Sequence, residues 1–190
     1  MRNCGASNVR FPLGLYTNTM KGCVMAKTIK VGAIGCGAIA ERLHVPDYAA
    51  CEQAQVVAFA DADLDRAKAL AAKFAPEAKV YADYKEMLTA GEVEAVSVCL
   101  PNILHAPVTI AALQAGCHVM VEKPMATSLA EAKKMVDAAK KAGKLLMVNQ
   151  TQRREPVHRK AKEVLDSGIM GKILHVSAMF GHSGPEDWSP

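Results

Sequence analysis

Two glycines in a tight turn, placed between an apolar strand and a helix, constrain this chain more than any other feature of its sequence. The segment TIKVGAIG (28–35) is predicted to be a strand, and the turn GCGAIA (35–40) follows it. Gly35 permits the tight turn, Gly37 lets a ligand approach the backbone, and the small Ala40 lets the helix pack closely. The N-terminus of such a helix favours a negatively charged group. The candidate phosphate-binding residues of this turn are Gly35, Gly37, Ala38 and Ile39.

Glycine turns also occur with a purely structural role, so a second feature is needed to assign a ligand. Dinucleotide-binding folds place an acidic residue at the end of the second strand, about 20 residues after the turn. Asp61 stands at that position, at the end of the predicted strand AQVVAFAD (54–61). Its carboxylate would accept hydrogen bonds from the adenosine ribose hydroxyls and repel a 2′-phosphate, which favours NAD over NADP. Arg66 could pair with such a phosphate or lie on a solvated helix face, so NADP stays the alternative.

Short apolar runs alternate with helical patterns along the rest of the chain from Thr28, which is typical of a parallel sheet wrapped by helices. The predicted strands are 28–35, 54–61, 94–101, 118–122 and 144–150. One of the intervening helices has clear ends, because Ser128 and Glu131 form a capping box and Gly143 is a stop signal. Right-handed crossovers would make this a doubly wound α/β Rossmann fold.

The domain organisation follows from where this alternation starts and stops. Residues 27–150 are predicted to be the dinucleotide-binding domain, and a polar, basic stretch near 149–152 marks its end. Residues 151–190 would begin a second α/β domain, with a helix at about 156–167 and the β-rich run KILHVSAMFGH.

The first 26 residues have no periodicity and are expected to be a disordered leader. Met25, followed by AKTIKVGAIG, looks like a natural start, which makes an extension upstream of the true start the favoured explanation. A weak organellar transit peptide is the alternative, because the segment contains no acidic residue.

Composition excludes several classes of protein. The chain has 190 residues, of which 51% are hydrophobic, so a sizeable core is within reach. No apolar run approaches the ~20 residues of a membrane helix, and we expect no membrane association. The formal charge is +4, but five basic residues and no acids lie within 1–30, so the remainder carries −1. That balance gives no support for nucleic-acid binding.

The six cysteines show no metal-ligand spacing and no CxxC pair. Reduced thiols in a cytoplasmic protein fit this pattern best, and no metal site is expected. A zinc hydrolase or a thiol enzyme is therefore disfavoured. Cys36 lies near a helix N-terminus, but bound cofactor would cover it, and a packing role is the favoured interpretation.

Polar residues follow the predicted strand 94–101. Pro101, Asn102 and His105 come at its carboxyl end, where open α/β sheets bind ligands. For His105 the simpler alternative is a histidine at a helix start that satisfies a local backbone group.

Two opposite charges and a proline end the next strand, in the sequence VEKPM. Glu122 and Lys123 lie at the same edge as the residues above, and Pro124 keeps Lys123 out of helical geometry. Charges placed there are costly to bury without partners. The structural alternative is a plain ion pair at the strand end, and a cis Lys123–Pro124 bond is left open.

Together these segments resemble the family of glucose–fructose oxidoreductase, inositol dehydrogenase and the rhizopine-catabolism protein MocA, from Lys27 to about His182. The residues that carry the resemblance are GAIGCGAIA (32–40), AFADADLDRA (58–67), CLPNILHAPVTIAALQAGCHVMVEKPMA (99–126), NQTQRREP (149–156) and GIMGKILHV (168–176). The spacing between PN-x-x-H and EKP is the most specific of these features.

The resemblance implies a Rossmann domain joined to an α/β domain with a large open sheet. Family members bind NAD or NADP and oxidise or reduce a sugar or cyclic polyol at a secondary carbon, and they form homo-oligomers through the second domain. The resemblance places Pro101, Asn102 and His105 on the nicotinamide side of the site. It places Glu122 and Lys123 at the reacting centre.

Hydride transfer from a secondary alcohol requires that the hydroxyl proton leave as the carbonyl forms. The Lys123 ammonium could stabilise the developing negative charge on oxygen or relay the proton, so Lys123 is the candidate catalytic residue. Glu122 is expected to orient the nicotinamide or the lysine. Gln150 and Arg153 are candidates to border the cofactor or a polar substrate, and the alternative for Arg153 is an interdomain ion pair.

The sequence departs from the family pattern near its end. In the family, an aspartate followed four residues later by a histidine supplies the proton-transfer group, downstream of the equivalent of GHSGPEDWSP. This chain ends at Pro190 without that pair, so we expect the N-terminal part of a dehydrogenase, inactive by itself. The alternative hypothesis is a non-catalytic dinucleotide-binding module or regulatory remnant.

Overall fold

The computed structural model describes residues 27–179 and residue 181. The predicted leader at 1–26 and the last residues from 182 onward, including His182 and Asp187, lie outside the described residues.

Six parallel strands form one sheet in the order β3-β2-β1-β4-β5-β6. The strands are β1 (Ile29–Ile34), β2 (Ala54–Ala60), β3 (Lys79–Tyr81), β4 (Ala95–Val98), β5 (His118–Glu122) and β6 (Leu146–Asn149). From the central β1 the chain runs outward to β3 and then returns to start β4 on the other side of β1. This reversal is the doubly wound arrangement, which confirms the predicted α/β Rossmann fold.

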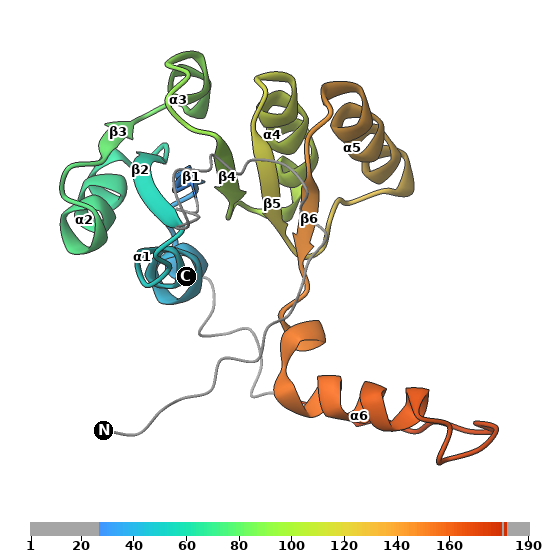
Figure 1. Ribbon diagram of the computed structural model, residues 1–190. Helices are drawn as coiled ribbons and strands as arrows, with labels where there is room; N and C mark the ends of the chain where they lie inside the picture. The colour runs from blue at the N-terminus through green and yellow to red at the C-terminus, as the bar shows by residue number, and fades with distance from the viewer. Residues whose placement is uncertain (1–26, 180, 182–190) are drawn as a thin grey trace, which may run out of the picture.

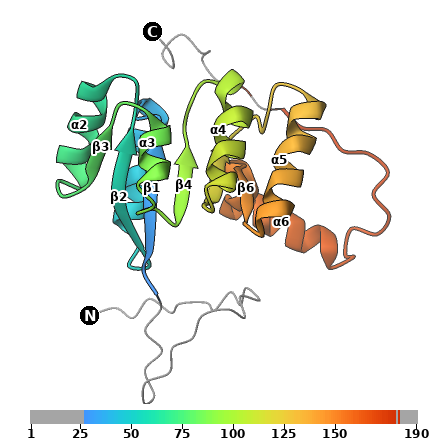
Figure 2. The same cartoon turned by 90° about the horizontal axis from the view of Figure 1, so that it is seen from above.

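Helices cover both faces of the sheet (Figure 1). They are η1 (Ala40–His44), α1 (Val45–Ala49), α2 (Leu64–Phe74), α3 (Tyr84–Thr89), α4 (Asn102–Gln114), α5 (Leu129–Ala142), η2 (Thr151–Arg154) and α6 (Pro156–Asp166). The helices α4 and α5 lie side by side on one face (Figure 2). The helix α6 extends away from the sheet and is exposed along its length (Figure 1).

The hydrophobic core has two parts, one on each face of the sheet. The larger part packs α3, α4 and α5 against the strands, with Met87, Leu113 and Met135 fully buried. The smaller part joins α1 and α2 to β1 and β2 around Phe59 and Val45. Because strands buried on both faces need apolar residues throughout, the strand segments read as continuous apolar runs.

The predicted ends of α5 are confirmed. Ser128 Oγ accepts a hydrogen bond from the Glu131 backbone N–H at 3.2 Å, and the carboxylate of Glu131 accepts from the Thr127 backbone N–H at 3.1 Å. Gly143 takes a left-handed conformation with φ +63° where the helix stops.

Two sequence predictions differ from the structure. The short β3 and α3 between α2 and β4 were not predicted, so the strand expected third is β4. The run KILHVSAMFGH was predicted to be β-rich, but its described residues 172–179 and 181 form no strand. A strand needs hydrogen-bonding neighbours, and these residues are exposed with none beside them.

Candidate active site

The glycine turn lies at the carboxyl end of β1, where the sheet reverses its strand order. Gly35 has φ +89°, and its N–H donates to the Ala60 carbonyl at 2.8 Å. A Cβ at this position would stand 2.3 Å from the carbonyl oxygen of Cys99, so only glycine fits. A Cβ at Gly37 would meet no atom within 4 Å, and the backbone there borders open space. Ala38 and the exposed Ile39 follow at the entry to η1.

Asp61 follows β2 directly and anchors this turn. Its Oδ2 accepts a hydrogen bond from the Cys36 N–H at 2.7 Å, and its Oδ1 accepts from the Asp63 N–H at 2.9 Å. Only 11% of the side chain is exposed. Each carboxylate oxygen has a second lone pair, so Asp61 can hold the turn and still accept a ligand hydroxyl.

Arg66 contacts the same acidic group. Its guanidinium lies 3.8 Å from Asp61 Oδ2 and 3.2 Å from Asp63 Oδ2, with 53% of the side chain exposed. The structure therefore places Arg66 on a solvated face of α2 and beside the carboxylate that would select the cofactor.

Cys36 is packed inside the turn. Burial, together with the charge of Asp61, raises the pKa of its thiol to about 12. A neutral thiol is a poor nucleophile, which agrees with the packing role expected from the sequence.

The residues after β4 divide into exposed and buried groups. Pro101 and Asn102 are exposed at the start of α4. His105 is only 1% exposed, with Nδ1 2.7 Å from the Pro124 carbonyl oxygen and Nε2 2.8 Å from the Leu100 carbonyl oxygen. Its ring joins the loop after β4 to the loop after β5, which is the local backbone role considered above.

Glu122 lies in a buried polar network at the end of β5. Its Oε1 accepts hydrogen bonds from His44 Nε2 at 2.8 Å and from Asn149 Nδ2 at 2.6 Å. Its Oε2 accepts from the Lys123 backbone N–H at 3.1 Å. Arg154 donates to the amide oxygen of Asn149, so the network reaches η2.

The environment of Glu122 favours its charged form. Burial by itself would raise the pKa of the carboxyl, but the hydrogen bonds from His44, Asn149 and the Lys123 N–H outweigh it and hold the pKa below the usual value. Glu122 is therefore an acceptor at neutral pH and a weak base.

The side chain of Lys123 takes no part in this network. The residue is exposed, and its ammonium has no hydrogen-bond or ion-pair partner among the residues that the structure describes. The alternative of a Glu122–Lys123 ion pair is thus not observed, because Glu122 pairs with His44 instead. The Lys123–Pro124 bond, left open by the sequence, is cis.

Gln150 and Arg153 follow β6 on the same side of the sheet and are exposed. The Arg153 N–H donates to the Gln150 carbonyl at 3.0 Å, which closes the turn into η2. Their side chains are free to meet a ligand or another part of the protein.

His44, Ser97 and Asn149 were not among the site residues predicted from the sequence. Asn149 is the last residue of β6, at the carboxyl edge where the other candidates were found, and could have been identified by that position. His44 and Ser97 lie inside predicted elements, and no pattern distinguishes them from core residues.

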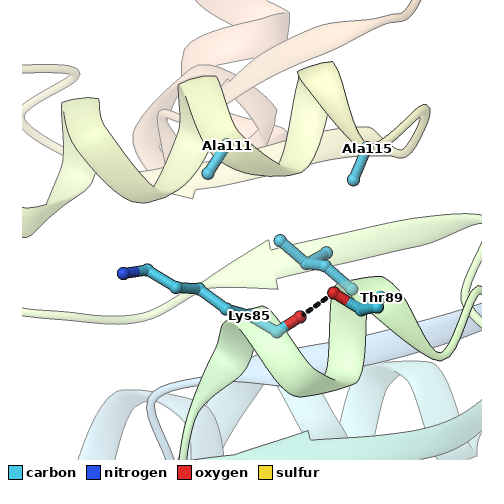
Figure 3. A pocket seen from close by; sticks show the side chains of 5 residues that line it. Lys85, Thr89, Ala111 and Ala115 are labelled. Carbon is cyan, nitrogen blue, oxygen red and sulfur yellow. Dashed lines mark hydrogen bonds between the residues drawn. The ribbon is translucent and has the colours of Figure 1, made fainter.

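A separate depression of about 360 Å³ lies between α3 and α4, lined by Lys85, Leu88, Thr89, Ala111 and Ala115 (Figure 3). Ala111 lies in the last turn of α4 and Ala115 is its C-cap, at the opposite edge of the sheet from Lys123. This depression is not part of the candidate active site.

Within residues 27–179, no cluster of three or more His, Cys, Asp or Glu side chains could hold a metal ion. The helices in that range are also too short or too polar to cross a membrane.

The reversed strand order, the glycine turn and the acid after β2 define a dinucleotide-binding Rossmann domain. The chain belongs to the GFO_IDH_MocA oxidoreductase family with an NAD-binding Rossmann fold, which matches residues 29–150. This finding confirms the resemblance seen in the sequence.

Known proteins similar to this chain include enzymes of sugar chemistry. D-glucoside 3-dehydrogenase of Escherichia coli K12 is 36% identical over 159 residues, covering 84% of this chain and 45% of the relative. The 3-ketoreductase KijD10 of Actinomadura kijaniata, solved with NADP, has 37% identity and a TM-score of 0.71, covering 77% of this chain and 46% of that one. WlbA dehydrogenase of Bordetella pertussis, solved with NADH and UDP-GlcNAcA, has 31% identity and a TM-score of 0.71. The match covers 76% of this chain and 44% of WlbA. The chain thus spans about half the length of these relatives.

Proposed function

We propose that this chain is the nicotinamide-binding part of an NAD(P)-dependent oxidoreductase that interconverts a secondary alcohol and a carbonyl on a sugar or cyclic polyol. The unpartnered ammonium of Lys123 at the carboxyl edge of the sheet is the observation that carries this proposal. A cation kept free of ion pairs at a ligand-binding edge is suited to contact a substrate oxygen. The names of the similar proteins support the substrate class.

The residues at the carboxyl edge of the sheet can be matched to the parts of a nicotinamide dinucleotide. Gly35, Gly37, Ala38 and Ile39 would hold the pyrophosphate at the open side of the turn, and Asp61 would accept the ribose hydroxyls. Pro101 and Asn102 would line the nicotinamide side. His105, being buried, would act by holding the loop that carries them. The nicotinamide, when bound, supplies or accepts the hydride.

Lys123 would hold the substrate oxygen and stabilise its negative charge, or relay its proton. Glu122 would orient Lys123 rather than remove a proton, because its lowered pKa makes it a weak base. Gln150 and Arg153 would border the cofactor or a polar substrate from the end of β6.

The complete reaction would need residues that follow the Rossmann domain. The chain covers 45% of the E. coli relative, so we place the remaining catalytic group and the substrate pocket in a second domain that starts at about residue 151. Assembly into homo-oligomers would use that domain. The free thiols of Cys36, Cys99 and Cys117, all buried, fit a cytoplasmic protein.

Calorimetry and an activity assay test the proposal together. The chain should bind NAD or NADP and should show no turnover with a panel of aldoses and inositols. The protein extended by the downstream sequence of its gene should show turnover. An extended protein that binds the cofactor without turnover would favour a non-catalytic module. Absence of cofactor binding by the folded chain would refute the proposal.

We further propose that NAD is preferred to NADP, because Asp61 would repel a 2′-phosphate. Asp61→Asn should reduce the ratio of NADH to NADPH affinity by roughly tenfold, about the effect of one charge-assisted contact. Asp83→Asn is a matched control, since Asp83 also accepts a backbone N–H at a helix start but lies at α3. An unchanged ratio in Asp61→Asn would contradict the assignment, and Arg66 would then be the residue to test.

A further inference from the structure

His44 is a buried histidine that the proposed function does not use. Its side chain is 1% exposed and contacts polar groups from three strands. Nδ1 lies 2.6 Å from Ser97 Oγ on β4, and Nε2 lies 2.8 Å from Glu122 on β5 and 3.1 Å from Asn149 on β6. No other described histidine contacts a carboxylate.

The direction of the central hydrogen bond follows from the partners. The carboxylate of Glu122 can only accept, so His44 Nε2 carries the proton and donates. The 3.1 Å contact between Nε2 and Asn149 Nδ2 is then a contact between two donors, and both of them bond to Glu122 Oε1. With Asn149 on the same oxygen and the Lys123 N–H on the other, both oxygens of Glu122 are fixed. Charge-assisted bonds of this kind are among the stronger ones in proteins.

The backbone is distorted at the point that brings His44 into this contact. Residues 40–44 form a π-helical turn, in which the Val45 N–H bonds to the Ala40 carbonyl. Such turns are rare and often occur at functional sites. The turn lies in the helix whose N-terminus faces the proposed pyrophosphate site, so His44 joins that helix to the end of β5.

We propose that His44 is a positioning residue for Lys123. It fixes the carboxylate of Glu122, Glu122 holds the backbone N–H of Lys123, and the ammonium therefore leaves the strand end in one direction. This inference rests on the proposed function, which places the nicotinamide beside Lys123 and the adenosine half beside Asp61.

A histidine that only fills the core would behave differently from a positioning residue. Loss of packing would weaken the whole cofactor site, including the adenosine half. Loss of positioning would weaken only the nicotinamide end. ADP-ribose contains the adenosine half and the pyrophosphate but no nicotinamide. Its affinity therefore distinguishes a loss of packing from a loss of positioning.

The experiment measures NADH and ADP-ribose affinities of the whole chain by calorimetry. His44→Leu should weaken NADH about tenfold, as for loss of one charge-assisted bond, and leave ADP-ribose within about twofold. His44→Gln, whose amide can still donate to Glu122, should restore most of the NADH affinity. His118→Gln is the matched control, because His118 lies on the same strand at the opposite edge and bonds the Leu145 N–H at 3.0 Å.

The possible outcomes distinguish failure of the positioning role of His44 from failure of the proposed function. Equal weakening of both ligands by His44→Leu, or no weakening, would overturn the positioning role. Wild-type chain that binds neither ligand would instead refute the proposed function. If His44→Leu does not fold, Ser97→Ala takes its place, because it frees Nδ1 while keeping the ring. A selective loss of NADH affinity of about threefold would then support the role, and an equal effect on both ligands would refute it.

Discussion

Replacing Gly35 with alanine should cost the folded chain about 3 kcal/mol or more of unfolding free energy. The new Cβ would stand 2.3 Å from the Cys99 carbonyl oxygen, and the φ of +89° would be strained for any L side chain. The two backbone segments cannot easily move apart to relieve this clash, because both are held by hydrogen bonds. The Cys99 N–H donates to the Ile34 carbonyl at 2.8 Å, and the Gly35 N–H donates to the Ala60 carbonyl. The measurement is urea unfolding followed by circular dichroism.

Gly37→Ala is the matched control for this substitution. An added Cβ at Gly37 meets no atom within 4 Å, so the free energy of unfolding should stay within about 0.5 kcal/mol of wild type. The proposed pyrophosphate site should lose affinity for NADH in the same variant, since the methyl group would extend into that space. A similar loss of stability in the two variants would contradict this account of the turn.

Removing the Glu122 carboxylate should have an effect of comparable size. In Glu122→Ala, the buried donors of His44 and Asn149 lose their shared acceptor, and each buried donor left without a partner costs about 1–3 kcal/mol. Glu92→Ala is the control, because Glu92 forms an exposed ion pair with Lys79 whose loss should cost about 1 kcal/mol or less. Urea unfolding of the two variants checks the difference, and equal effects would contradict it.

Lowering the pH should remove the contribution of the Glu122 carboxylate to stability. The pKa of Glu122 is lowered in the folded protein, so its contribution to stability is complete above the ordinary carboxyl value of about 4.3 and is lost as the pH falls through the folded value. Wild-type chain should therefore lose stability on acidification below about pH 4.3 more steeply than Glu122→Gln, whose side chain does not titrate. Parallel pH profiles would show that other carboxylates dominate.

Local signals in the sequence were sufficient for the sheet and for most of its carboxyl edge. The glycine turn, the acid of Asp61 and the cap at Ser128 each act over a few residues, so a single sequence carries them. Apolar runs located five of the six strands because parallel strands are buried on both faces. The strand β3 was not predicted because it has only three residues, all of them half-buried or exposed.

The network around Glu122 could not be predicted in the same way. His44 meets Glu122 across 78 residues of chain, and Asn149 meets His44 across 105. The pattern of apolar residues gives no signal for the π-helical turn at residues 40–44 that contains His44. The sequence places Glu122 at a strand end, but the only ion-pair partner it indicates, as the structural alternative, is the adjacent Lys123, since sequence shows neighbours along the chain better than neighbours in space.

The bond between Arg154 and Asn149 gives η2 a mechanical link to the interior of the sheet. Arg154 is exposed, whereas Asn149 shares an oxygen of Glu122 with His44. The segment that follows the sheet is therefore joined through Asn149 and Glu122 to the residue next to Lys123. A displacement of η2 relative to the sheet would have to break the bond between Arg154 and Asn149.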